Sequence, residues 1–83
     1  MTWAKISDAI IDDPVLLGLP RGVRLLHVEA IVWCSRHGTD GVIPDHVLTR
    51  ITDEPQPYDA AAELLMAGVW TVTEAGYRIR EMP

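Results

Sequence analysis

Residues 21–38 read RGVRLLHVEAIVWCSRHG, and this stretch carries the clearest secondary-structure signal in the chain. Its apolar side chains recur at helical spacing, and those on the central face are Val23, Leu26, Ala30, Trp33 and His37. Further apolar residues widen this face until it nearly encircles the helix, which is typical of the buried centre of a domain. Gly38 predicts the helix end, because glycine readily adopts the left-handed conformation that terminates helices.

Beyond this helix, turn and helix signals follow in a regular order. A turn at residues 39–41 precedes a short strand at residues 42–43, and Pro44 fits the first turn of a second helix that runs to Ile51. A third helix begins at Pro57 and is closed by Gly68. Its inner face is expected to contain Ala61, Leu64, Leu65 and Gly68, and its outer face Asp59, Ala62, Glu63 and Met66.

The last part of the chain alternates between apolar and polar residues on either side of Gly76, which predicts a β-hairpin. One face would present Trp70, Val72, Tyr77 and Ile79, and the other Thr71, Thr73, Arg78 and Arg80. At the other end, residues 2–6 are expected to form a short strand, and Ser7 or Asp8 to cap a helical turn. Pro14 should interrupt that turn, before an apolar connector at residues 15–19.

These elements predict one α+β domain, residues 1–83, with the order helix, strand, helix, helix, β-hairpin. This is the order of a winged helix-turn-helix, in which the second and third helices form the helix-turn-helix and the hairpin forms the wing. The N-terminal segment could add a strand to the wing sheet.

The composition excludes several classes of protein. Hydrophobic residues make up 48% of the chain, too many for a disordered protein, yet there is no apolar run of about 18 residues for a membrane span. The N-terminal residues do not show the basic stretch followed by an apolar segment that is typical of a secretory signal, so we expect none. Cys34 is the only cysteine, which agrees with a reducing cytoplasm.

The charge is unevenly distributed. The net charge is -5, and residues 40–63 account for all of it, with six acidic side chains against Arg50: Asp40, Asp45, Asp53, Glu54, Asp59 and Glu63. This segment is either an ordinary solvated acidic face or a surface that repels phosphate and prefers a protein partner.

Several short stretches resemble a known family. They are Trp3-x-Lys5, Asp13-Pro14, the long helix, residues 39–44 (TDGVIP), residues 64–70 (LLMAGVW) and residues 76–79 (GYRI). In this order they resemble the N-terminal winged-helix domain of bacteriophage replication proteins of the replisome-organiser type, and similar small phage proteins of actinobacterial hosts. The resemblance implies a role in phage replication or transcriptional regulation in the host cytoplasm. The third helix, however, contains no Lys or Arg.

The chemistry-bearing residues do not form a recognised catalytic or metal motif. The metal ligands to consider are His27, Cys34, His37, His46 and Asp40, but their spacing matches no structural zinc pattern. A Cys34–His37 pair one helical turn apart is too common to indicate a nucleophile, and no glycine-rich phosphate loop is present. We therefore expect no enzymatic activity, no cofactor, no metal and no small-molecule substrate.

Two functions remain open. As a DNA-binding module, the chain would use the few cations near the wing, so that binding would be weak unless two copies act together as a homodimer; the candidates are Arg78, Arg80, Lys5 and Arg50. As a protein-binding module, it would use the outer face of the third helix, where the candidates are Asp59, Ala62, Glu63 and Met66.

The Arg21–His37 helix yields a prediction about stability. Leu26, Ala30 and Trp33 should be almost fully buried, with Leu64 and Trp70 packed against them. Replacing Trp33 with alanine should therefore lower the free energy of unfolding by about 3–5 kcal/mol, as measured by urea denaturation. A Trp33 side chain more than half exposed would contradict the prediction.

Overall fold

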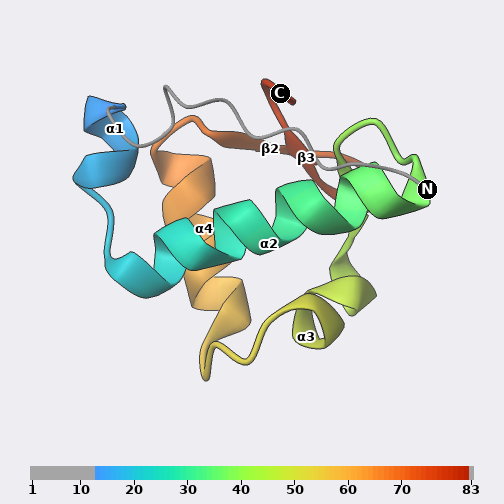
Figure 1. The fold of residues 1–83 in the computed structure, drawn as a ribbon, viewed down its shortest axis with the longest axis horizontal. Coiled ribbons are helices and arrows are strands. Elements are labelled where there is room, and N and C mark those ends of the chain that lie inside the picture. Colours follow the sequence, from blue (N-terminus) through green and yellow to red (C-terminus); the bar gives the residue numbers. More distant parts are fainter. Residues whose placement is uncertain (1–12, 83) are drawn as a thin grey trace.

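The computed structural model describes residues 13–82, and within that range they form an α+β domain with four α-helices and a three-stranded antiparallel sheet. The elements are α1 (Pro14–Leu17), α2 (Arg21–His37), β1 (Val42–Pro44), the 3₁₀ turn η2 (Asp45–Val47), α3 (Leu48–Ile51), α4 (Pro57–Met66), β2 (Trp70–Val72) and β3 (Gly76–Ile79). Figure 1 shows α2 lying across the domain, with α4 crossing behind it. The expected N-terminal strand and capped turn lie outside the described residues.

Helix α1 stands where the sequence predicted an apolar connector. The Asp13 side chain accepts a hydrogen bond from the Val15 backbone N–H at 2.9 Å, and Pro14 occupies the first turn, where its missing N–H costs nothing. The turn that Pro14 was expected to interrupt lies outside the described residues, and what the structure shows is that Asp13-Pro14 begins a new short helix, which the sequence analysis did not predict. Leu16 is buried, whereas Val15 and Leu17 are about half exposed.

Helix α2 has the predicted bounds, and Gly38 ends it in the left-handed conformation with φ +64°. The apolar face is narrower than expected. Leu25 is 50% exposed and Val32 is 43% exposed, so the expectation of a helix buried all round was wrong. Helices α3 and α4 and strand β1 contact α2, but these contacts leave Leu25 and Val32 substantially exposed.

The central tryptophan of the core is Trp70 and not Trp33. The Trp70 side chain is 1% exposed, whereas Trp33 lies at the edge of the core and is only partly buried. The Trp70 indole Nε1–H donates a hydrogen bond of 3.0 Å to Nδ1 of His27, which is buried on α2. The predicted burial of Leu26, Ala30 and Leu64 is confirmed, but that of Trp33 was wrong, because α2 turns the indole toward the rim of the core.

Strand β3 is the central strand of the sheet and pairs antiparallel with both β1 and β2. Trp70 pairs with Ile79 and Thr71 with Arg78, so the predicted hairpin is confirmed, and the residues of each pair lie on the same face as expected. Trp70 and Ile79 point into the core, while Arg78 and Thr71 are exposed on the other face. The sheet thus covers one side of α2 and presents a polar face to solvent.

The second helix of the predicted order is shorter and later than expected. Pro44 was expected in its first turn, but Pro44 ends β1, where it lies opposite Gly76 of β3. The chain then forms η2 and only afterwards the four-residue α3. The prediction was wrong because the fixed φ of proline suits an extended strand end as well as a helix start, and pairing with β3 selects the strand.

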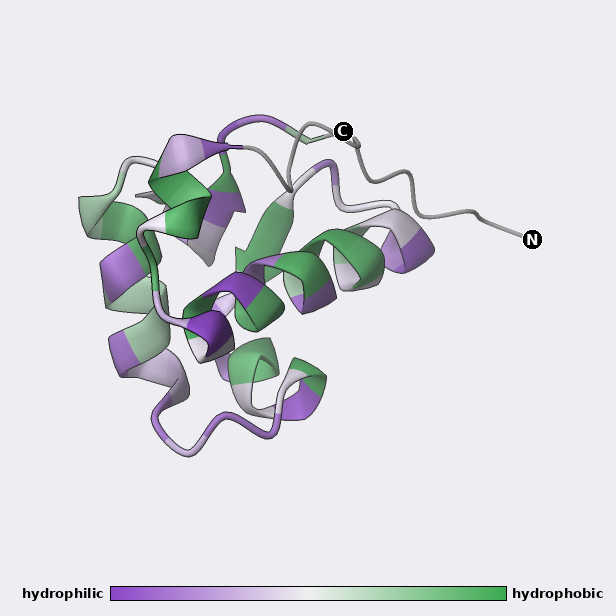
Figure 2. Cartoon of the chain, turned by 60° about the vertical axis from the view of Figure 1, so that its left-hand side comes forward, coloured by the Kyte–Doolittle hydropathy of each residue, from purple (hydrophilic) through white to green (hydrophobic). Residues whose placement is uncertain are grey.

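Helix α4 begins at Pro57 as predicted, and Gly68 follows its end with φ +78°. Its buried residues are Ala60, Ala61 and Leu64, which pack toward α2 and β2. Of the expected inner face, Ala61 and Leu64 are buried, Leu65 is only partly buried and Gly68 is exposed beyond the helix end, whereas Ala60 is buried although it was not expected there. In Figure 2 the ribbon of α4 alternates hydrophobic and hydrophilic colours along its length, as expected of a helix with one face in the core.

The His27–Trp70 hydrogen bond predicts a pH-dependent stability. Burial lowers the pKa of His27 from its ordinary value of 6.5, and the Asp13 carboxylate offsets part of this effect. The unfolded chain therefore binds a proton at a pH where the folded chain does not. We expect the free energy of unfolding to be fully present above about pH 6.5 and to fall as the pH decreases through that value toward the lowered folded pKa.

The measurement is the urea midpoint between about pH 5 and pH 8. In His27→Asn the amide oxygen can still accept from Trp70 but does not titrate, so the pH dependence should flatten. His46→Asn, at an exposed histidine, is the matched control and should retain it. An unchanged pH profile in His27→Asn would contradict the assignment.

Candidate functional site

The outer face of α4 is the most regular exposed surface of the described chain. Because Ala61 and Leu64 face the core, the side chains on the opposite side of the helix point into solvent. Asp59, Ala62, Glu63 and Met66 are all exposed, as the sequence predicted. Met66 is 88% exposed, an unusual position for a large apolar side chain. We call these four residues the α4 face.

Tyr58 extends this surface and was missed by the sequence analysis. It is 49% exposed, and its hydroxyl donates a hydrogen bond of 3.2 Å to the backbone oxygen of Asp45. This contact ties the first turn of α4 to η2. The signal in the sequence was the spacing of Tyr58 and Ala62, which places them one turn apart on the helix.

The two arginines of the hairpin each have a local partner. Arg78 lies on the exposed face of β3 and forms an ion pair with Asp40 at 3.6 Å, in which both side chains are more than half exposed. Such a pair is screened by water and contributes little to stability, but it neutralises part of the positive charge. Arg80 follows β3, and its guanidinium donates to the Gly68 backbone oxygen at 3.4 Å.

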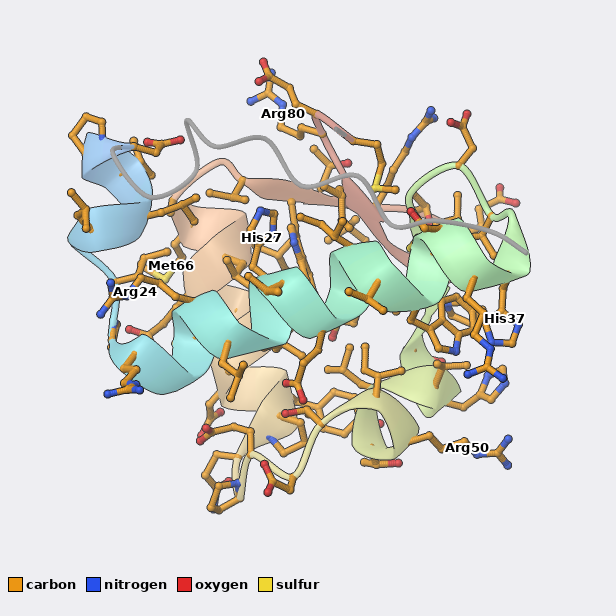
Figure 3. The ribbon with its side chains drawn as sticks, in the orientation of Figure 1. Arg24, His27, His37, Arg50, Met66 and Arg80 are labelled. Atoms are coloured by element: carbon orange, nitrogen blue, oxygen red, sulfur yellow. The ribbon has the colours of Figure 1, made fainter. Side chains whose placement is uncertain are left out.

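The remaining cations proposed for DNA binding lie elsewhere. Arg50 is in the last turn of α3, and Figure 3 shows Arg50 and Arg80 projecting from opposite sides of the domain. Lys5 lies outside the described residues. The structure therefore does not bring Arg50 and Arg80 into one basic patch.

A group of exposed arginine and histidine side chains lies where the end of α2 packs near α3. Arg36 and His37 occupy the last turn of α2, His46 lies in η2, and Arg50 closes α3. All four side chains are exposed. In Figure 3 His37 and Arg50 project from the same end of the domain. We call these four residues the basic end; sequence reasoning recognised only Arg50 as an interaction candidate.

The residues considered as metal ligands are dispersed. His27 is engaged by Trp70, and the Cys34 thiol is buried with Sγ 3.7 Å from the Val42 backbone oxygen. Burial raises the pKa of Cys34, which disfavours the thiolate needed for nucleophilic or metal chemistry. His37 and His46 lie in solvent. Within residues 13–82, no group of three or more His, Cys, Asp or Glu side chains is arranged to hold a metal ion.

Comparison of the chain with protein-family models, curated proteins and solved structures finds no match. Over the part of the chain that the structure describes, no helix has the length and apolar character needed to cross a membrane.

Gly76 fixes the hairpin against η2, which yields a stability prediction. It has φ +152°, and an added Cβ would lie 2.6 Å from the Ile43 backbone oxygen and overlap the Asp45 backbone nitrogen. Gly76→Ala should therefore lower the free energy of unfolding by about 2–4 kcal/mol in urea denaturation. Gly38→Ala is the matched control, because Gly38 also has positive φ but no atom lies within 4 Å of the added Cβ.

In Gly38→Ala the free energy of unfolding should fall by only about 1 kcal/mol, which is the cost of the left-handed conformation alone. Equal losses in the two variants would show that contact with η2 does not restrain the hairpin.

Proposed function

We propose that this chain is a winged-helix interaction module whose α4 face binds a basic segment of a protein partner. The order α2, β1, α3, α4, β2, β3 and the sheet order β1-β3-β2 support this fold assignment. In a winged helix, the helix that corresponds to α4 is the one normally presented to a partner. The resemblance seen in the sequence would place the module in phage replication or regulation.

The charge of the α4 face carries the proposal. Asp59 and Glu63 lie one helical turn apart and are both exposed, and α4 itself contains no Lys or Arg. Asp53 in the preceding loop is also exposed, so the negative potential extends past the helix start. A DNA phosphate backbone would be repelled here, whereas a cationic protein segment would be attracted.

Met66 adds an apolar contact to this electrostatic attraction. Charges at an interface mainly guide association and select the partner, so affinity also requires buried apolar surface. The unbranched methionine side chain adapts to partners of different shape, and at 88% exposure nearly all of it is available. The partner best matched to this face is an amphipathic helix with a lysine- or arginine-rich side beside a short apolar stripe.

DNA binding through the hairpin is the competing function. It is supported by the exposed Arg78 beside Thr71 on one strand face. The ion pair with Asp40 and the separation of Arg50 from Arg80 weigh against it, because few phosphates would be neutralised at once.

The charge reversal Asp59→Lys with Glu63→Lys tests the proposal. Binding of an amphipathic leucine–lysine peptide, measured by isothermal titration calorimetry at low salt, should weaken about tenfold or more, because attraction becomes repulsion. Glu74→Lys with Glu81→Lys makes the same change in charge at exposed residues around the hairpin and is the matched control.

The control should bind the peptide far better than the α4 variant does. Equal losses of peptide affinity in the two variants would show only an effect of net charge and would contradict a specific site on α4. A gain in duplex DNA affinity by the α4 variant, with no loss of peptide binding, would favour the DNA function instead.

A further inference from the structure

The basic end differs from the rest of the domain in its charge. On α2, η2 and α3 the only carboxylates are Glu29 and Asp45, whereas Arg36 and Arg50 bring two permanent positive charges. His37 and His46 add exposed ring nitrogens that can donate hydrogen bonds. Helices α2 and α3 pack against each other, so these side chains project from neighbouring elements of the fold.

An aromatic pair lies within the same group of residues. The rings of Trp33 and His37 stack with their centroids 4.5 Å apart and an angle of 28° between their planes. Trp33 packs against the hydrophobic core, while His37 is exposed. The indole therefore holds the imidazole in a defined orientation at the surface. Proteins that bind single-stranded nucleic acids combine exposed rings, on which bases stack, with positively charged side chains that pair with phosphates. Both kinds of side chain project from this end of the domain.

We propose that the basic end is a binding site for single-stranded nucleic acid. Arg36 and Arg50 pair with backbone phosphates, and an unpaired base stacks on the His37 imidazole. Because stacking requires a base that is free of its duplex partner, we expect single strands to bind more tightly than duplex DNA. The site is independent of the α4 face and involves none of its residues.

The small number of cations sets the expected strength. Neutralising about two phosphates gives a salt slope of about −1.4 in a plot of log affinity against log salt concentration for a single strand. Binding should thus be weak and readily lost as salt is raised. The acidic residues 53–63 and the net charge of -5 would weaken it further, so measurements belong at low ionic strength.

The test measures fluorescence anisotropy of a labelled oligothymidylate of about 12 nucleotides. Arg36→Ala with Arg50→Ala should reduce affinity at least tenfold and remove most of the salt slope. Arg78→Ala with Arg80→Ala, which removes the same charge from the hairpin, should bind nearly as well as the unmodified chain. Circular dichroism checks that each variant is folded.

His37 variants separate stacking from charge. His37→Ala should lose about tenfold in affinity. His37→Lys, which supplies a positive charge but no ring, should not restore it, whereas His37→Phe should. Full restoration by lysine would overturn the stacking contact. The site itself would be overturned by absence of binding in the unmodified chain, by equal losses in the two arginine pairs, or by tighter binding of duplex than of single strand.

Discussion

The hydrogen bond between Trp70 and His27 joins the longest helix to the sheet, and the other packing contacts are arranged around it. The centroid of the Trp70 ring lies 6.5 Å from that of His27 on α2 and 5.7 Å from that of Tyr77 on β3, so the indole lies near both elements. A buried indole N–H without an acceptor would be costly, and the neutral imidazole provides one. Because the acceptor is Nδ1, the imidazole must carry its proton on Nε2. One bond thereby fixes the tautomer of His27, the rotamer of Trp70 and the distance of β2 from α2.

The fold was predictable from the sequence wherever the signal was local. Gly38 ends α2 and Pro57 begins α4, because glycine and proline restrict the backbone at their own positions. Pro44 is different, because its φ suits either a helix start or a strand end. Pairing with Gly76, which is far along the chain, determines that Pro44 ends a strand. The burial of Trp70 in place of Trp33 is also decided at long range, because helical periodicity cannot show on which side neighbouring elements will pack.

The candidate surfaces divide in the same way. The exposure of Asp59, Glu63 and Met66 follows from the start of α4 and the helical period, so the α4 face was predicted residue by residue. The distribution of the arginines was not predicted from the sequence, because the relative positions of Arg50 and Arg80 depend on the whole fold. The Trp33–His37 pair was visible as a spacing of four residues, but it was interpreted as part of the core stripe.

The strand order β1-β3-β2 also constrains how the domain assembles during synthesis. Within residues 13–82 every strand pair includes β3, yet β3 is translated after both of its neighbours, so neither β1 nor β2 can pair with it until residues 76–79 have left the ribosome. Helices α2, α3 and α4 are complete earlier and can pack in the meantime. Until β3 arrives, Ile43 and Trp70 have no sheet to hold them in place, and the nascent chain exposes apolar surface of the kind that chaperones bind.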